Sequence, residues 1–178
     1  MEKQAKNYFK LFAGVVLCLL VRLIPFRAPN IEPVFASTMP FSKAYGAWAG
    51  FSFAVSSVLL YDFVTKTAGM QTFFTVFAYG LIGLWSAWYF KSREANILNF
   101  AKFAIMGTLV YDALTGLSVG PIFFHQSFLS SLSGQIPFTL LHLSGNLIFA
   151  LTLSPAIYHF LGKEKKEVVS FINVPSTI

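Results

Sequence analysis

Residues 67–90, TAGMQTFFTVFAYGLIGLWSAWYF, contain no charged side chain. Residues 113–162, the 50 residues that separate Asp112 from Lys163, contain none either. An apolar run of about 18 residues is already a candidate for a membrane-spanning helix. The lipid bilayer is therefore the predicted solvent of this chain, and each polar side chain inside these runs needs a partner or a function.

The composition agrees with a membrane protein, because 56% of the 178 residues are hydrophobic and only 11% are charged. A soluble domain has about 25% charged residues. At about 20 residues per helix, up to six or seven spans fit, which leaves no room for a soluble enzymatic domain. The single cysteine, Cys18, excludes a disulfide framework and a cysteine metal site, and no cofactor is predicted.

We predict an all-α integral membrane protein, a compact bundle of six transmembrane helices of which the second is short. The predicted spans are 8–26, 31–42, 44–64, 69–90, 98–118 and 136–161. Residues 119–135 are expected to form an apolar connection that lies against the bundle or dips into it. Together these segments make one membrane domain, 1–162, followed by a cytoplasmic tail, 163–178.

The basic residues predict the orientation, because six crossings place both termini on one side of the membrane. That side would hold ten basic residues and the other side three, which by the positive-inside rule makes it the cytoplasmic side of the cell membrane. A nucleic-acid partner is not predicted, since the basic residues serve topology. The ten are Lys3, Lys6, Lys10, Lys43, Lys91, Arg93, Lys102, Lys163, Lys165 and Lys166, and the three are Arg22, Arg27 and Lys66.

A short internal echo links two of the predicted spans. The segment LLYDFVT at 59–65 resembles LVYDALT at 109–115, and a glycine and a Phe-Phe pair follow each. Transporters often contain internal repeats with binding sites at the repeat interface. A chance or purely geometric origin of the echo stays open.

Polar side chains recur at helical spacing, mostly in the predicted outer halves of the spans. Such clustering predicts a shared pocket open to the outside, and the alternative is hydrogen bonding that holds helices together. The stripes are Ser57, Tyr61 and Thr65 with Asp62 beside them; Gln71, Thr75 and Tyr79; Thr108, Tyr111, Asp112 and Thr115; and His142 with Asn146.

Asp112 is the costliest of these residues, at about 2.5–3.5 kcal/mol for a carboxylate near the membrane centre. It could contact a ligand, pair with Arg22, or cap a turn at the interface. His142 and Asn146 could be a metal-ligand pair or a hydrogen bond between helices. No carboxylate lies in register with them, so no metal site is predicted.

The segment RLIPFRAPNIEP, residues 22–33, combines charge with stiffness. Its three prolines bias the preceding residues toward extended backbone. A rigid loop that contains Arg22, Arg27, Asn30 and Glu32 suits recognition of a polar solute beside the pocket. The two arginines favour an anionic or amide-bearing solute, and their alternative role is to anchor lipid headgroups.

The order of these features resembles the substrate-specific (S) components of energy-coupling factor (ECF) transporters. The resemblance covers roughly residues 10–160. It rests on RLIP at 22–25, PNIEP at 29–33, Gly46 and Gly50, YDFVT at 61–65, YDALTG at 111–116, and QIPFTLLHLSGN at 135–146.

The resemblance implies a membrane-embedded subunit that binds a vitamin or related micronutrient at its outer side and delivers it inwards. It also implies a transmembrane coupling protein and a pair of cytoplasmic ATPases, which must be separate chains because no GxxxxGK[ST] loop is present. The predicted solute-binding residues are Arg22, Arg27, Asn30, Glu32, Tyr61, Asp62, Gln71, Thr75, Tyr79, Thr108, Tyr111, Asp112, His142 and Asn146.

Docking of the coupling protein is expected on the cytoplasmic half of the first helix. Family members often have alanines spaced by three residues there, and this chain departs from that pattern. It offers Ala13, Gly14 and Cys18 instead. Gly14 and Cys18 have a spacing of small residues that permits close helix approach.

Two other function classes stay open. A non-transporting scaffold or assembly protein would bind no solute. An intramembrane enzyme would need Ser133 or Ser144 as nucleophile, with His125 or His142 as base. No Gly-x-Ser-x-Gly or His-Glu-x-x-His pattern is present, so the chain is not predicted to be an enzyme.

Overall fold

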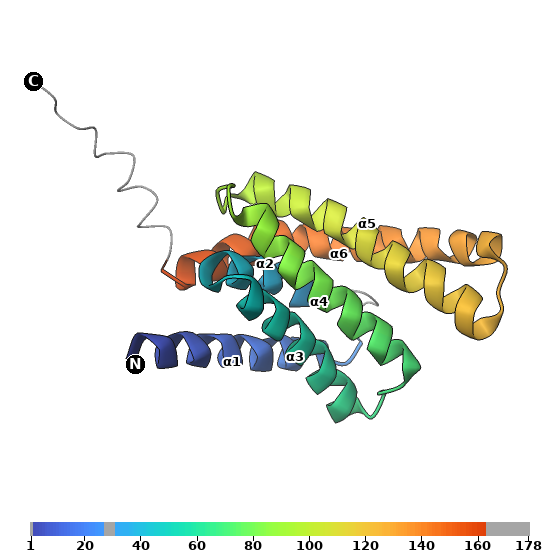
Figure 1. The fold of residues 1–178 in the computed structure, drawn as a ribbon, viewed down its shortest axis with the longest axis horizontal. Helices are drawn as coiled ribbons and strands as arrows, with labels where there is room; N and C mark the ends of the chain where they lie inside the picture. Colours follow the sequence, from blue (N-terminus) through green and yellow to red (C-terminus); the bar gives the residue numbers. More distant parts are fainter. Residues whose placement is uncertain (1, 27–30, 163–178) are drawn as a thin grey trace, which may run out of the picture.

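The structure is a computed structural model that describes residues 2–26 and 31–162, and this part of the chain contains helices and no strand. The predicted all-α class is therefore confirmed for the described residues. The predicted site residues Arg27 and Asn30 and the predicted tail lie outside them. The helices are α1 (Glu2–Arg22), α2 (Val34–Tyr45), α3 (Ala47–Thr65), α4 (Met70–Phe90), α5 (Ile97–Phe124) and α6 (Phe128–Phe160) (Figure 1).

Five helices, all except α2, are long and apolar enough to cross a membrane. The second helix is short, as the sequence predicts: its 12 residues span about 18 Å at 1.5 Å per residue. The hydrocarbon core of a bilayer is about 30 Å thick. Helix length and composition therefore account for five spans.

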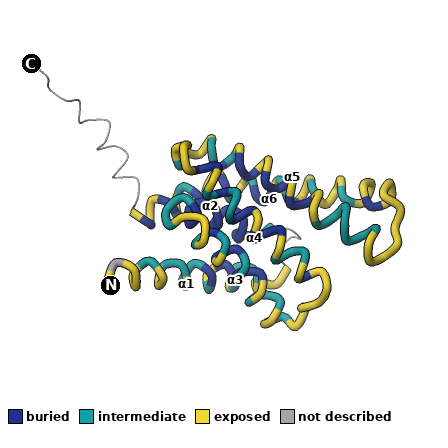
Figure 2. The backbone as a smooth tube through the Cα atoms, viewed as in Figure 1, coloured by how far each residue is buried: buried dark blue, intermediate teal, exposed yellow. Residues whose placement is uncertain are grey.

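Helix α2 forms the centre of the molecule, and its residues 34–42 are all buried (Figure 2). It packs against α3, α4 and α6. The ring of Phe35 lies 6.1 Å from the ring of Phe103 on α5 and 6.5 Å from that of Tyr79 on α4. The Ser154 hydroxyl of α6 donates to the Ala36 carbonyl at 2.7 Å. A helix enclosed on all sides in this way faces protein rather than lipid.

Two glycines allow α3 and α4 to cross closely. A Cβ atom built on Gly83 would lie 2.6 Å from the carbonyl oxygen of Gly50, a distance that real Cβ atoms do not adopt. The Ser42 hydroxyl of α2 donates to the Gly83 carbonyl at the same place, at 3.1 Å. Small residues at helix crossings let backbones approach and exchange such bonds.

Both ends of the described chain lie at one end of the bundle, which we call the basic end (Figure 1). There the Lys10 ammonium on α1 donates to the Phe160 carbonyl at the end of α6, at 3.2 Å. The Lys43 ammonium donates to the carbonyls of Phe90 and Arg93, at 3.1 and 3.0 Å. Lysine side chains therefore neutralise the carboxyl ends of α4 and α6.

The prediction of an apolar connection over residues 119–135 is wrong, because α5 continues to Phe124 and α6 begins at Phe128. The turn consists of His125–Ser127 and is closed by a bond from the Gln126 amide to the Gly120 carbonyl, at 3.3 Å. Membrane-spanning helices tolerate a proline such as Pro121, because neighbouring groups can satisfy the backbone carbonyl that the proline leaves without a donor. The resulting α5–α6 hairpin projects beyond the α3–α4 turn (Figure 1).

Candidate functional site

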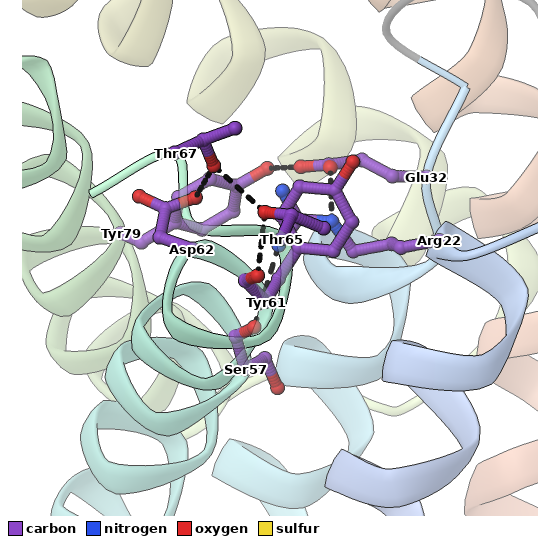
Figure 3. Close-up of polar contacts among 8 residues, drawn as sticks. All are labelled: Arg22, Glu32, Ser57, Tyr61, Asp62, Thr65, Thr67 and Tyr79. Carbon is purple, nitrogen blue, oxygen red and sulfur yellow. Dashed lines mark hydrogen bonds and ion pairs between the residues drawn. The ribbon is translucent and has the colours of Figure 1, made fainter.

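A charged cluster joins the end of α1 to α3 and α4 (Figure 3). Arg22 Nε lies 3.0 Å from Glu32 Oε2, and the two side chains are only 9% and 12% exposed. The Tyr79 hydroxyl donates to the other carboxylate oxygen, Glu32 Oε1. The Arg22 guanidinium also lies 3.8 Å from the centroid of the Tyr61 ring and donates to the Ser57 carbonyl at 3.3 Å. Protein groups therefore balance the Arg22 charge.

This arrangement changes the interpretation of the predicted solute contacts in the first loop. Arg22 binds Glu32 across the connection between α1 and α2, so its guanidinium is not directed at a cavity. Glu32 accepts from two partners and precedes the buried helix α2. The pair therefore ties the end of α1 to the residue before Pro33 and α2, and neither side chain lines a cavity described below.

Asp62 has a local role at the turn between α3 and α4. The Thr72 hydroxyl donates to Asp62 Oδ2 at 2.5 Å, and the Thr67 hydroxyl lies 3.5 Å from Oδ1 (Figure 3 labels Asp62 and Thr67). The Gly69 amide donates to Thr72 Oγ1 at 3.1 Å. These bonds close the turn, so Asp62 stabilises the hairpin.

A second polar cluster joins α5 to α6. His142 Nδ1 lies 2.7 Å from Asp112 Oδ1, and the two side chains are 4% and 2% exposed. One helical turn away, the Asn146 amide donates to the Thr108 hydroxyl at 2.9 Å. Pairing with His142 was not among the three roles open for Asp112, and the alternative of pairing with Arg22 is wrong, because Arg22 contacts Glu32. The remaining oxygens, Asp112 Oδ2 and Asn146 Oδ1, have no hydrogen-bond partner in the described part of the chain.

Aromatic rings connect the two clusters. The ring of Tyr111 lies 4.7 Å from that of Tyr79 and 5.3 Å from that of His142. The ring of Phe138 lies 5.7 Å from that of His142. Tyr79 of α4, Tyr111 of α5 and His142 of α6 therefore share one interior environment.

The sequence echo corresponds to matching contacts in two helical hairpins, α3–α4 and α5–α6. In each hairpin the aspartate bonds to a side chain of the following helix, Asp62 to Thr72 and Asp112 to His142. In each, the threonine of the motif donates to the tyrosine carbonyl four residues earlier, at 2.8 Å for Thr65 and 2.9 Å for Thr115.

A cavity of about 390 Å³ lies between the start of α4, the end of α5 and the start of α6. We call it the α4–α5–α6 cavity. Ligand pockets in proteins have volumes of about 300–1,000 Å³. The cavity lies away from the basic end, at the side of the bundle where the α5–α6 turn is found. Its lining residues are Gln71, Phe74, Thr75, Tyr111, Thr115, Gly116, Val119, Gly120, Phe124, Gln126, Gln135 and Phe138.

Three predicted site residues line this cavity, namely Gln71, Thr75 and Tyr111. The others are placed elsewhere. Tyr79, Thr108, Asp112, His142 and Asn146 are buried among the helices. Arg22, Glu32 and Tyr61 belong to the charged cluster, and Asp62 to the α3–α4 turn.

Sequence reasoning missed two glutamines that line the cavity, Gln126 in the α5–α6 turn and Gln135 on α6. A usable signal was present on α6. Gln135, Thr139, His142 and Asn146 recur at helical spacing, so the polar stripe continues beyond His142 toward the start of the helix. The predicted span began at residue 136 and therefore cut this stripe short.

A second cavity of about 390 Å³ lies at the basic end, between α1, α2 and α3. The polar residues of α4, α5 and α6 do not line it. Its lining residues are Gln4, Asn7, Tyr8, Leu11, Tyr45, Trp48, Ala49 and Ser52. The α4–α5–α6 cavity is the better candidate site, because three predicted residues converge on it.

The small residues of α1 have an internal use. A Cβ atom on Gly14 would lie 2.8 Å from the ring of Phe41. Cys18 is 3% exposed, and its thiol donates to the Ser37 hydroxyl at 3.5 Å. Gly14 and Cys18 therefore let α1 approach α2 within the bundle, and Ala13 is half-buried.

No protein-family model, curated protein or solved structure matches this chain. Support for a function must therefore come from its own residues and their geometry.

Proposed function

We propose that this chain is the membrane-embedded solute-binding subunit of an ECF-type importer, which captures a vitamin or related micronutrient at the outer side. The α4–α5–α6 cavity is the observation that carries the proposal. It has the volume of a small-molecule site. Gln71, Thr75 and Tyr111 contribute polar groups to it from two helices.

The proposed orientation follows from the basic end. Lys10, Lys43 and Arg93 lie there together, and the positive-inside rule assigns such an end to the cytoplasm. The α4–α5–α6 cavity then faces the outside of the cell membrane. We propose that α2 and the segment before it make the sixth crossing, so that both termini are cytoplasmic.

Delivery of the solute needs partners that this chain does not contain. We propose a transmembrane coupling protein and a pair of cytoplasmic ATPases, because the sequence has no phosphate-binding loop of its own. The docking surface for the coupling protein stays a prediction. Gly14 and Cys18 are occupied by contacts within the bundle.

The contacts of the candidate nucleophiles favour transport over catalysis. The Ser144 hydroxyl donates to the Leu140 carbonyl at 2.7 Å, and the Ser133 hydroxyl to the Ser130 carbonyl at 2.9 Å. A hydrolase needs its nucleophile within hydrogen-bond reach of a base. Neither serine has such a contact with a histidine in the described residues. We therefore propose a non-enzymatic role.

The proposal is tested by purifying the full chain in detergent and analysing the bound small molecules by mass spectrometry and calorimetry. We expect one solute with a dissociation constant in the nanomolar range. Gln71→Ala should weaken its binding, and Gln4→Ala, at the cavity of the basic end, should not. Absence of any bound solute together with a fixed protein partner would favour the scaffold alternative instead.

A further inference from the structure

We propose that the α4–α5–α6 cavity accepts a solute without net charge, which carries a flat ring and a group that both donates and accepts hydrogen bonds, such as a ring amide. This inference rests on the proposed function and adds the chemical class of the solute. It follows from three properties of the cavity: its lack of charge, its side-chain amides and its aromatic walls.

The described residues that line the cavity include no aspartate, glutamate, lysine, arginine or histidine. A charged group that leaves water without meeting an opposite charge pays a desolvation penalty of about several kcal/mol. A charged solute would therefore need a counter-charge close to the cavity. The nearby ionisable side chains decide whether one exists.

The buried ionisable side chains next to the lining are paired with each other, whereas His125, between the lining residues Phe124 and Gln126, is exposed. Arg22 contacts Glu32 at 3.0 Å, and Asp112 contacts His142 at 2.7 Å. Tyr111 connects both pairs to the cavity, because its ring packs against Tyr79 and His142. A charged solute would therefore compete with these pairs for a buried counter-charge, and separating a buried pair leaves one partner uncompensated. The sequence expectation from Arg22 and Arg27 was an anionic or amide-bearing solute; the pairing of Arg22 with Glu32 favours the amide-bearing alternative, and Arg27 lies outside the described residues.

Three glutamines provide the side-chain amides of the cavity, and each uses half of its amide within the protein. The other half has no partner among the described residues. For Gln71 and Gln135 this other half is the carbonyl oxygen, and for Gln126 it is the NH₂ group. The occupied halves are Gln71 Nε2, which donates to the Thr67 carbonyl at 3.1 Å, Gln135 Nε2, which donates to Thr139 Oγ1 at 3.2 Å, and Gln126 Oε1, which accepts from Ser131 Oγ at 3.3 Å.

The three side-chain amides therefore bring both donors and acceptors to the lining of the cavity. A ring amide or imide has the complementary set, with an N–H beside a carbonyl. A carboxylate lacks the donor, and an ammonium group lacks the acceptor. The hydrogen-bonding pattern therefore leads to the same class of solute as the absence of charge.

Aromatic side chains provide the apolar walls. Phe74, Tyr111, Phe124 and Phe138 line the cavity. Phe74 is held by an edge contact with Phe123, with ring centroids 5.3 Å apart. Aromatic faces and edges pack well against flat rings. A planar ring would therefore find contacts from three helices.

The experiment uses yeast extract divided by ion exchange into uncharged, anionic and cationic fractions. Each fraction is incubated with the purified full chain, and thermal stabilisation and retained compounds are measured. Stabilisation by the uncharged fraction, with a ring compound retained, supports the proposal. Stabilisation by a charged fraction alone overturns it and leaves the proposed function standing. If no fraction stabilises the chain, the proposed function fails, and the inference fails with it.

Variants test the role of the amides. Gln135→Ala should weaken binding of the retained compound about 3- to 10-fold, which corresponds to one hydrogen bond. Gln4→Ala should leave the affinity unchanged, since Gln4 lines the cavity of the basic end. The melting temperature of the solute-free Gln135→Ala protein checks that the fold is intact. An affinity equal to that of the unmodified chain would overturn the assignment of Gln135.

Discussion

Glu32 is the residue on which the charged cluster depends, because its two oxygens have different partners. One oxygen contacts Arg22 and the other accepts from Tyr79. The sequence indicated that Arg22 and Glu32 lie in one polar loop, but not that they pair. The pairing depends on where α2 enters the bundle, and no local pattern encodes that position.

Glu32→Gln tests this dependence. Loss of the carboxylate leaves the buried Arg22 charge without compensation, and breaking a buried pair costs about 3–5 kcal/mol. We expect a marked fall in unfolding free energy in bicelles, measured by denaturant titration. Glu94→Gln makes the same change at an exposed position and should have little effect. Equal effects of both variants would show that the pair is unimportant for stability.

His142→Leu tests the second buried pair. The substitution leaves Asp112 buried without its partner, and an unsatisfied buried group costs about 1–3 kcal/mol, or more if charged. We expect a lower melting temperature of the detergent-solubilised chain. His125→Leu provides the matched control, since His125 is exposed at the α5–α6 turn. A destabilised control with a stable His142→Leu protein would contradict this assignment.

The pairing of Asp112 shows where prediction from the sequence ends at this scale. Helical spacing correctly grouped Thr108 with Asp112, and His142 with Asn146. The pairing of these two groups depends on the rotation of α5 and α6 about their own axes. That rotation is fixed by contacts between residues 30 and 38 positions apart in the sequence. The spacing of residues within one helix does not reveal it.

At the scale of helices, α3 and α4 can cross closely because Gly50 and Gly83 have no Cβ atom. In the sequence analysis, Gly50 entered only through the family resemblance. Its packing partner, Gly83, lies on the next helix, so no pattern within α3 indicated the contact. Helix positions and types were largely predictable from the apolar runs. The continuation of α5 past Gly120 and Pro121 was not, because both residues usually end helices in water.

Gly83→Ala should disrupt this crossing. Its Cβ atom would lie 2.6 Å from the backbone oxygen of Gly50, which cannot move aside as a side chain can. We expect a loss of folded protein, measured by size-exclusion chromatography in detergent. Gly134→Ala is the control: a Cβ atom there meets nothing within 4 Å, and alanine is the better helix former. An unaffected Gly83→Ala protein would contradict the close crossing.

At the scale of the whole molecule, the sequence predicted the short second helix but not its central position. Six of the nine residues of its buried segment, 34–42, are apolar or proline, and three are hydroxyl-bearing. The same composition would suit a helix facing lipid. Only the packing of α3, α4 and α6 around it makes it the core.

The proposed topology predicts opposite labelling of two turns. Ala68→Cys lies in the exposed α3–α4 turn, and Ser92→Cys in the exposed turn after α4. In intact cells a membrane-impermeant maleimide should label Cys at 68 and not at 92. The native Cys18 is buried, so its background should be low. Labelling of both positions, or of 92 alone, would contradict the proposed orientation.

The lengths of the helices have a consequence for the surrounding lipid. With 28 and 33 residues, α5 and α6 measure about 42 and 50 Å, whereas α3, with 19 residues, measures about 28 Å. A bilayer of uniform thickness cannot match both hydrophobic lengths without tilt or local deformation. In the proposed membrane topology, either α5 and α6 are more tilted than α3, or the bilayer next to them is thicker. The melting temperature of the protein in nanodiscs should depend on lipid chain length.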